Sequence, residues 1–376
     1  MVRWCFFSPS DKSRDVLAGD TRSTGGAEAQ VAYLAAALAR KGHEVSLIYG
    51  EGEATLATEV IAGVTCVDAV PTWQPSALAS FWQTLRKLAP NVIYARLPSD
   101  FLWMIRLYSR QAGAKFIYAL ASPMHCNPWT AYDYNRWFHA PVFALGLHGA
   151  DVIVVQHEHQ VPLMSPSLQR RTAHVPNLVR FFGDQPRPIE QTRYDAVWIG
   201  MIRPEKQLER FLDLAAALPE LQFAVVGGFD SQHHAKGRAE LEQRMLSLPN
   251  LSFLGPQQAE AIQMMLTLSK VLVNTSPAEG FPNTMLEAWS LGVPVVALSV
   301  DPGGVMQKEG IGFLSGSLAG LLHDVSVLAS NSELNLQLGS RGLEYVRRNH
   351  SLEAVYASLI KTLPALVPAD PMIQAS

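Results

Sequence analysis

Two glutamates on either side of a short loop are the side chains of this sequence best suited to chemistry. Glu279 and Glu287 enclose the loop residues Gly280, Phe281, Pro282, Asn283 and Thr284. We expect a strand to end before this loop and a helix to begin near Thr284. The N–H groups at that helix start would suit a diphosphate, and a glycine lets a ligand approach the backbone closely. Both carboxylates would then accept hydrogen bonds from sugar hydroxyls.

Glu287 also has a purely structural interpretation. Thr284 and Glu287 have the spacing of a capping box, in which two side chains bond backbone N–H groups at a helix start. Gly292 and Pro294 would end the same helix. Glu279 has no structural alternative beyond that of a solvated loop residue. Whether Glu287 binds a ligand or caps its helix stays open at this point.

Two cations in another loop could serve the same ligand. Arg203 and Lys206 follow an expected strand at 195–199. Fixed cations beside a helix N-terminus would stabilise negative charge on a bound ligand. Taken alone, the same two residues would read as a solvated turn around Pro204.

Metal-ligating patterns are weak. No Asp-x-Asp pair occurs in the sequence, and a divalent cation bound to a diphosphate usually needs such carboxylates. His157 and His159 would share a strand face, and His233 and His234 are adjacent, but neither pair has an evident third ligand. We expect surface or loop histidines here and no metal site.

Alternating strands and helices must position these residues. Apolar runs predict strands in the first half at 2–8, 44–49, 91–95, 115–121 and 151–155. Amphipathic stretches between them predict helices at 27–41, 81–88 and 101–112. After a polar stretch with two prolines the pattern restarts, with strands at 195–199, 222–227, 251–254, 271–274 and 293–298. The helices expected there are 207–217, 235–247, 259–268 and, at the end, 351–363.

Such alternation indicates βαβ units and parallel sheets. We therefore expect an α/β protein with two doubly wound, Rossmann-like domains. The first would span 1–182, the linker 183–193 and the second 194–350, and 351–376 would carry a helix that returns toward the first domain. Ligands of such sheets bind at the carboxyl ends of the strands, so a central cleft between the domains is the expected site.

Composition narrows the class of protein. The chain has 376 residues and a net charge of −3, which argues against a dedicated nucleic-acid binder. Residues 1–180 hold 16 lysines and arginines against 13 acidic residues, whereas the remainder holds 14 against 20, so the two halves should meet different partners. Three scattered cysteines indicate a reducing cytosol. We expect no signal peptide and no membrane span.

The stretch 279–294 strongly resembles the signature of family 4 glycosyltransferases, a large retaining family with the GT-B fold. The resemblance continues through 301–304, 310–314 and 200–206. Val175-Pro176-Asn177 and Gly25-Gly26-Ala27-Glu28 extend it more weakly. It is dense from about 195 to 350 and sparse in the first half.

The resemblance implies a role for each matching residue. Glu279 would contact the donor sugar, Glu287 would hold the nucleotide ribose, and Arg203 and Lys206 would grip the diphosphate. Gly25 and Gly26 would let a first-domain loop approach the phosphate or sugar. The donor would be a nucleotide sugar, most commonly UDP-linked in this family but also GDP- or ADP-linked, and no further cofactor is implied. The leaving phosphate itself would help to deprotonate the acceptor.

The first domain departs from the family pattern at one position. Many members carry a histidine at the end of a first-domain strand, and Ala121 takes that place here. His125 or Ser122 is the candidate replacement.

The acceptor, a glycan or lipid-linked molecule, should bind the first domain. That half combines aromatic residues, including Trp129, Trp137 and Phe138, with basic residues such as Arg96. The combination suits an anionic membrane surface or a lipid diphosphate, but it equally suits an ordinary core with solvated arginines. The expected location is cytoplasmic, with peripheral membrane contact as the further hypothesis.

Three other functions are alternatives for such a sequence. A GT-B epimerase or phosphorylase would share the fold without transferring a sugar to an alcohol acceptor. A nucleotide-sugar-binding protein without activity would keep the donor site. A Rossmann dehydrogenase is disfavoured, because no Gly-x-Gly-x-x-Gly follows a strand.

Overall fold

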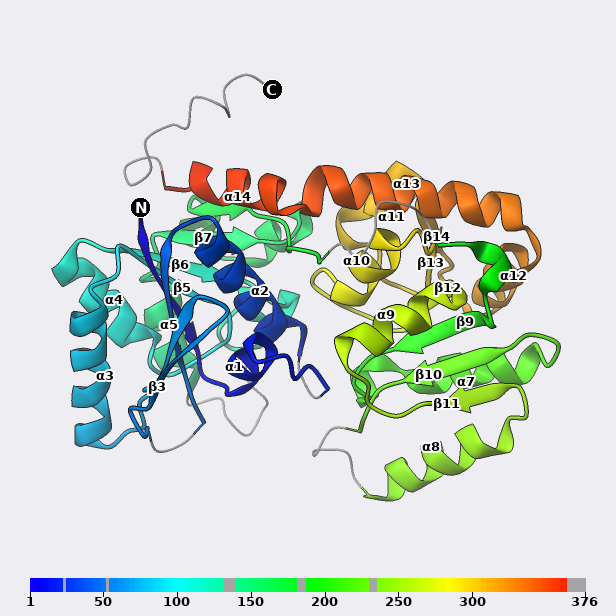
Figure 1. Ribbon diagram of the computed structural model, residues 1–376, viewed down its shortest axis with the longest axis horizontal. Helices are drawn as coiled ribbons and strands as arrows, with labels where there is room; N and C mark the ends of the chain where they lie inside the picture. Colours follow the sequence, from blue (N-terminus) through cyan, green and yellow to red (C-terminus); the bar gives the residue numbers. More distant parts are fainter. Residues whose placement is uncertain (23–24, 52–53, 132–138, 181–186, 230–234, 364–376) are drawn as a thin grey trace. The chain divides into compact units, whose positions relative to one another are not determined.

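The computed structural model describes residues 1–22, 25–51, 54–131, 139–180, 187–229 and 235–363. They fall into two compact units (Figure 1). Unit 1 comprises Met1–Leu178 and Leu352–Ser376, and unit 2 comprises Val179–Ser351. Each unit contains one sheet. The expected α/β class with doubly wound sheets is confirmed.

The sheet of unit 1 has the order β3-β4-β2-β1-β5-β6-β7-β8. Its neighbouring strands are parallel except for the β3–β4 pair. The chain order reverses between β1 and β5, which makes their carboxyl ends the switch point of this sheet. The strands are β1 Arg3–Ser8, β2 Glu44–Tyr49, β3 Thr58–Ile61, β4 Val64–Asp68, β5 Val92–Ala95, β6 Lys115–Ala119, β7 Val152–Val155 and β8 Thr172–His174.

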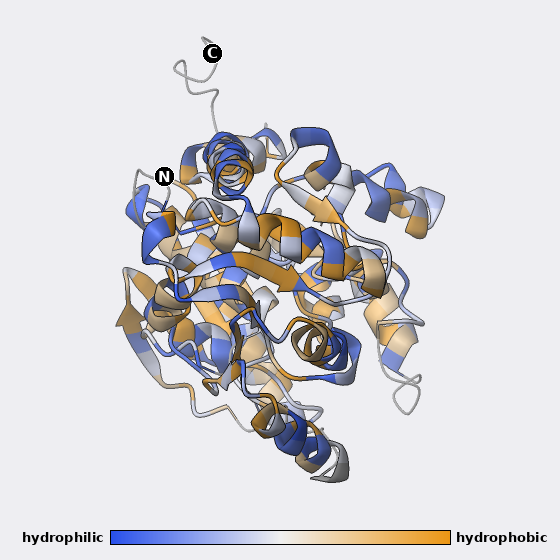
Figure 2. Ribbon diagram, turned by 90° about the vertical axis from the view of Figure 1, so that its right-hand side faces the viewer, coloured by the Kyte–Doolittle hydropathy of each residue, from blue (hydrophilic) through white to orange (hydrophobic). Residues whose placement is uncertain are grey.

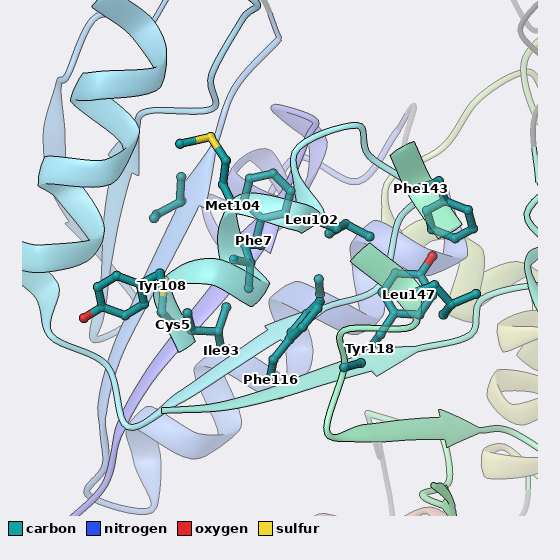
Figure 3. Close-up of a cluster of buried hydrophobic side chains, with 14 of the residues drawn as sticks. Cys5, Phe7, Ile93, Leu102, Met104, Tyr108, Phe116, Tyr118, Phe143 and Leu147 are labelled. Carbon is teal, nitrogen blue, oxygen red and sulfur yellow. The ribbon is translucent and has the colours of Figure 1, made fainter. Parts of the chain in front are cut away.

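Two apolar clusters cover the two faces of this sheet. Successive side chains of a strand point to opposite faces, so Cys5 and Phe7 of β1 enter one cluster and Trp4 and Phe6 the other. Figure 3 shows the first cluster, where Phe7 lies among aromatic and aliphatic side chains from neighbouring elements. The helices of unit 1 are α1 Lys12–Leu17, α2 Gly26–Arg40, α3 Pro75–Leu88, α4 Leu102–Ala112, α5 Ala140–Leu147, α6 Pro166–Gln169 and α14 Leu352–Lys361.

Helix α14 belongs to unit 1 although it comes from the end of the chain. Its Val355 and Leu359 are buried in the second cluster. The Tyr356 hydroxyl lies 2.9 Å from His43 Nε2, and Lys41 Nζ lies 3.6 Å from a Glu353 carboxylate oxygen. The N-terminal sheet therefore completes its core with C-terminal residues.

The sheet of unit 2 has the order β11-β10-β9-β12-β13-β14, and all its neighbouring strands are parallel. The chain order reverses between β9 and β12, so their carboxyl ends form the switch point of this sheet. The strands are β9 Tyr194–Ile199, β10 Phe223–Val226, β11 Leu251–Phe253, β12 Ser269–Asn274, β13 Val295–Ala297 and β14 Gly312–Leu314.

Helices enclose both faces of this sheet as well. In Figure 2 the strands are mostly apolar, whereas the helices carry both polar and apolar residues, as expected for helices that bury one side only. The helices of unit 2 are α7 Leu208–Ala217, α8 Ala235–Ser247, α9 Ala259–Thr267, α10 Asn283–Ser290, α11 Val305–Glu309, α12 Leu318–Ser330 and α13 Ser332–His350. Short 3-10 turns complete the chain: η1 Pro123–Cys126, η3 Glu158–Leu163, η4 Ile189–Gln191, η5 Pro204–Lys206 and η6 Pro302–Gly304.

The chain passes between the units after Leu178 and again before Leu352, whereas we expected the linker at 183–193. Residues 183–186 lie outside the described part of the chain. Arg187 is buried in unit 2, where its guanidinium donates to the carbonyl of Lys270 and to Asn335 Oδ1. The later half of the expected linker therefore packs as part of unit 2.

Candidate functional site

Two loops of unit 2 meet because β9 and β12 are neighbours in the sheet. The loop after β9 carries Arg203 and Lys206, and the loop after β12 carries Glu279. The strands are paired in parallel, with Ala196 opposite Val271, so both loops leave the same edge. Residues 73 positions apart in sequence are thereby brought together.

Lys206 and Glu279 form an ion pair. The Lys206 side chain is 29% exposed and the Glu279 side chain 17%. Thr275 Oγ1 donates to the Lys206 carbonyl at 2.7 Å and accepts from Trp198 Nε1 at 3.0 Å. Since Thr275 and Trp198 are buried, the backbone that carries Lys206 is anchored to the core of unit 2.

The turn that presents Lys206 has an unusual backbone. Gln207 adopts φ 48° and ψ 49°, a left-handed conformation that a non-glycine residue takes at a cost of ~1–3 kcal/mol. It ends η5 and begins α7. Arg203 precedes the same turn, with its side chain 40% exposed and its Nη1 3.9 Å from a Glu205 carboxylate oxygen. The predicted cations therefore lie on one turn, and Lys206 is the one paired with Glu279.

Helix α10 begins at Asn283, with Pro282 at the N-cap position. Thr284 is then the second helical residue, whereas a capping box needs its Thr at the N-cap. The capping-box interpretation of Glu287 is therefore wrong. The predicted helix end is confirmed: Gly292 has φ 70°, and the Val293 N–H bonds the Ala288 carbonyl at 2.9 Å.

Glu287 titrates unlike an ordinary glutamate. Burial raises the pKa of its carboxyl group to about 7, and the positive charge of Arg180 lowers that pKa to a smaller extent. Arg180 Nη2 also lies 3.8 Å from a Glu260 carboxylate oxygen. Arg180 was not singled out by the sequence, although it follows closely on Val175-Pro176-Asn177, and only its position near Glu287 draws attention to it.

The loop between Glu279 and Glu287 is anchored by buried residues. Gly280, Phe281 and Pro282 are buried. The Phe281 ring lies 5.1 Å from His350 and 6.4 Å from Trp289, and Trp289 Nε1 donates to a backbone carbonyl at 3.0 Å. Asn283 and Thr284 are half-buried and open helix α10, where the first backbone N–H groups have no carbonyl partner within the helix.

Gly227 lets the segments that follow β9 and β10 approach each other closely. Gly227, which follows β10, has φ 153°, and a Cβ there would collide with the Gly200 carbonyl after β9. This contact lets the two strands stay paired beyond their ends, since the Ile202 N–H bonds the Gly228 carbonyl at 2.8 Å. The backbone segment between β9 and Arg203 is thereby bonded to the segment that follows β10.

In unit 1, Gly25 is the N-cap of α2, and Gly26 is the first helical residue. A Cβ on Gly25 would collide with the Glu28 carboxylate. Glu28 thus curls back over the start of its own helix, which carries partial positive charge. The role expected for Gly25 and Gly26, close approach to a phosphate or sugar, stays a prediction.

The candidate replacements for the missing histidine have different surroundings. Ser122 caps η1, because its hydroxyl accepts from the Met124 N–H at 3.3 Å. His125 lies within η1 and is half-buried. Burial and the nearby positive charge of Arg96 lower the pKa of His125 to about 4, so its imidazole is neutral at pH 7. Ser122 therefore has a structural task, whereas His125 stays available for binding.

Candidate metal sites were sought among the remaining histidines. His157 directly precedes η3 and lies outside the strands, and its ring lies 5.8 Å from that of His159. Across the described ranges, no three His, Cys, Asp or Glu side chains come together as a metal site would require. His233, His234, Trp137 and Phe138 lie outside those ranges.

Sequence models of two families match this chain. "Glycosyltransferase Family 4" matches residues 24–179, and "Glycosyl transferases group 1" matches 193–331. The alpha-galactosylglucosyldiacylglycerol synthase of Streptococcus pneumoniae is 26% identical over 146 residues, 35% of this chain. The match spans 39% of that protein, so the chain covers about two fifths of the curated relatives it matches.

Solved structures share the fold. A sucrose-phosphate synthase from Thermosynechococcus elongatus has a TM-score of 0.74 and 19% identity, with 97% of this chain and 99% of that one covered. The Anabaena protein Alr3699/HepE, in complex with UDP and glucose, has a TM-score of 0.72 and 16% identity over 97% of this chain and all of its own. At such identities the likeness establishes the architecture alone.

Proposed function

The chain belongs to glycosyltransferase family 4, and we propose that it is a retaining enzyme. It moves a sugar from a nucleoside-diphosphate sugar to a glycan or lipid-linked acceptor without a metal ion. The observation that carries the proposal is the Lys206–Glu279 pair, fixed at the switch point of the unit 2 sheet and followed in sequence by the start of α10.

Lys206 and Arg203 bind the diphosphate in this proposal, together with the N–H groups of Gly280–Thr284 at the start of α10. Lys206 has a second task, because its bond to Glu279 orients that carboxylate. Glu279 accepts a hydrogen bond from the donor sugar. The cations and the helix terminus act where the leaving diphosphate gains charge, so they lower the barrier rather than only tightening binding.

Glu287 binds the ribose of the nucleotide. A carboxylate with a pKa of about 7 is partly protonated at neutral pH and can both accept and donate a hydrogen bond to vicinal hydroxyls. Arg180 favours the ionised form. Nucleotide affinity should therefore depend on pH near neutrality. The proposed nucleotide of the donor is UDP or GDP, and the UDP bound in the Alr3699/HepE structure supports UDP.

The cationic residues proposed to bind the diphosphate support metal independence. The cations of unit 2 supply the charge neutralisation that a divalent ion would otherwise bring. Retention is supported by family membership: the leaving phosphate takes the acceptor proton on the face from which it departs. In unit 1, Gly25, Gly26 and the neutral His125 are the proposed contacts to the substrates.

We propose action in the cytoplasm with peripheral contact to an anionic membrane. No helix in the described part of the chain is both long and apolar enough to cross a bilayer. The net charge of +3 over residues 1–180 supports contact through unit 1. Failure to sediment with anionic liposomes at low salt contradicts the membrane contact.

A thermal-shift screen of nucleotides and nucleotide sugars tests the donor site. A ligand at 100 times its Kd adds ~2.7 kcal/mol of stability. Glu287→Gln should weaken nucleotide binding, and Glu279→Gln should reduce turnover more than nucleotide affinity. Glu240→Gln, on the exposed side of α8, is the matched control. Stabilisation by no nucleoside diphosphate contradicts the proposal.

Product analysis separates the alternatives that share this fold. Release of nucleoside diphosphate that depends on an added acceptor supports transfer. An epimerised sugar nucleotide, or sugar phosphate formed with inorganic phosphate, indicates the epimerase or phosphorylase instead. Nucleotide binding without turnover, across a panel of glycan and lipid-linked acceptors, indicates an inactive binding protein.

A further inference from the structure

Arg96 is a buried cation at the switch point of the unit 1 sheet. It directly follows β5 and is 4% exposed. Across the described residues, no Asp or Glu forms an ion pair with it. A buried charge without a counter-charge costs several kcal/mol relative to water. An arginine kept in such a place calls for a function.

The hydrogen bonds of Arg96 leave part of its guanidinium unused. Nη2 donates to Asn177 Oδ1 at 2.8 Å, and Nη1 lies 3.5 Å from the Tyr94 hydroxyl. Nε is buried and finds no acceptor in the described structure. Within the described part of the chain, the hydrogen-bond acceptors of this guanidinium are therefore neutral oxygens, whereas its planar set of donors matches a phosphate or carboxylate.

Two other polar groups of the same region also lack partners. Gln156 Nε2 donates to Asn177 Oδ1 at 3.2 Å, and the Gln156 N–H donates to Gln160 Oε1 at 2.7 Å. This arrangement leaves Gln160 Nε2 buried without an acceptor, and His125 Nδ1 is in the same situation, as far as the described residues go. Arg96 directly follows β5, His125 lies in η1 after β6, and Gln160 lies in η3 after β7. These three strands are neighbours in the sheet.

The cluster is held in place before any ligand arrives. The Gln30 side chain of α2 bonds both the carbonyl and the N–H of Leu178 at 2.8 Å, and Leu178 is the residue after Asn177. Gln30, Asn177 and Gln160 are buried, whereas His125 is half-buried. His125 is therefore the member of the cluster that solvent reaches, and ligand entry is expected on its side.

We propose that this cluster binds a phosphate-type anion, which is the anionic group of the acceptor. Arg96 supplies the charge, and Arg96 Nε, Gln160 Nε2 and His125 donate to the anionic oxygens. Ligands of doubly wound sheets bind where the chain order reverses, which here is the β1/β5 edge that ends in Arg96. The assignment to the acceptor rests on the proposed function, whereas the anion site itself does not.

The first experiment measures inorganic phosphate binding by calorimetry and by thermal shift at constant ionic strength. Phosphate should bind the wild type, Arg96→Met should weaken binding at least tenfold, and Arg96→Lys should weaken it less. Arg110→Gln removes an equal charge from the exposed end of α4 and should change nothing. No phosphate binding to the wild type, or equal binding to Arg96→Met, overturns the proposal.

A second measurement keeps the test decisive if Arg96→Met does not fold. The buried Nε–H of Arg96 exchanges slowly and gives its own NMR signal, which Arg96→Lys identifies by its loss. Phosphate should shift this signal in the wild type, whereas chloride at the same ionic strength should not. If phosphate does not shift this NMR signal, the proposed site is refuted.

Nucleotide titrations separate this proposal from the donor site. UDP and GDP should stabilise Arg96→Met as much as the wild type, because their site lies in unit 2. Equal loss of nucleotide and phosphate binding would mean that Arg96 serves the donor and would overturn the acceptor assignment. If no nucleotide binds the wild type, the proposed function fails while phosphate binding still decides the anion site.

A matched pair of ligands identifies the source of the anion. Glycerol 3-phosphate and its dihexanoyl ester, a short-chain phosphatidate, differ only in their acyl chains. Both should bind the wild type and lose affinity in Arg96→Met. Tighter binding of the ester indicates a lipid phosphate as acceptor, and equal binding indicates a water-soluble phosphorylated one. Binding of either that survives Arg96→Met counts against the site.

Discussion

Each of the two sheets places a cation at its switch point, but the two cations have different partners. Lys206 in unit 2 is partly exposed and pairs with Glu279. Arg96 in unit 1 is buried and, among the described residues, bonds only an amide oxygen and a phenol. The same architecture therefore presents a charge that is already balanced and one that is not. A balanced cation can orient a neighbour as well as bind, whereas an unbalanced one gains most from an incoming anion.

The largest effect should come from removing the balanced cation. Lys206→Ala should lower kcat by ~10²–10³, because one preorganised donor to the developing charge is lost and Glu279 loses its orientation. Steady-state kinetics with donor and acceptor measure this. Lys308→Ala, at an exposed position of α11, should keep wild-type rates. Activity of Lys206→Ala within threefold of wild type would remove the pair from the mechanism.

Glu287 should make the stability of the protein depend on pH. Its folded-state pKa of about 7 exceeds the ordinary value of 4.5. The stabilisation from holding this proton is therefore complete below pH 4.5 and is lost as the pH rises through 7, by at most ~3 kcal/mol. Glu287→Gln should lower the pH dependence of the thermal midpoint between pH 5 and 8. Glu240→Gln should leave it as in the wild type, and equal slopes in all three proteins would contradict the assignment.

Charge removal should affect the two units with opposite sign. Lys206→Met leaves Glu279 without its partner and should destabilise, whereas Lys206→Met combined with Glu279→Gln should recover part of the loss. The coupling should be about 1 kcal/mol, since the pair is partly exposed. Arg96→Met removes a buried charge and leaves no other unpaired, so stability should stay equal or rise. Urea unfolding of the wild type, Lys206→Met, Glu279→Gln, the double variant and Arg96→Met measures these effects. A large loss of stability in Arg96→Met would indicate that Arg96 has a structural role.

The smallest effect concerns the turn that carries Lys206. Gln207→Gly relieves a left-handed backbone conformation but adds flexibility to the unfolded chain. The net change in unfolding free energy should be below about 1 kcal/mol, while turnover should fall slightly as the turn loosens. Gly255→Ala is the reverse control, because that residue also has positive φ (65°) with open space around it and should lose stability instead.

Much of the fold could be predicted because its strands are continuous apolar runs. The run at 44–49 coincides with β2, and that at 115–121 contains β6. The β3–β4 hairpin was not predicted. Its turn uses Ala62 and Gly63 with φ of 50° and 79°, whereas the usual sequence signal for such a turn is Asn-Gly or Asp-Gly. Val60 is 71% exposed, so the edge strand also lacks an apolar pattern.

The candidate sites, like the fold, could be predicted from the sequence only in part. Glu279 and Lys206 could be named from sequence, but their pairing could not, because it depends on β9 and β12 becoming neighbours through a reversal of strand order. The burial of Arg96 could not be read from sequence either, since arginine is rarely buried. The sequence alone places Arg96 among the basic residues of a surface. Resemblance to a family finds residues that its members share, whereas a buried charge particular to one chain appears only with the coordinates.

The place of helix α14 in the sequence affects the order in which the two units can fold. Val355, Leu359 and Leu363 belong to the core of unit 1, yet they are translated after the whole of unit 2. Unit 2 is one uninterrupted stretch, and the Val179 N–H bonds the His350 carbonyl at 3.1 Å, so its two ends meet as in an inserted domain. Unit 2 can therefore fold before residues 352–363 are made, whereas unit 1, although it is translated first, needs those residues to complete its core.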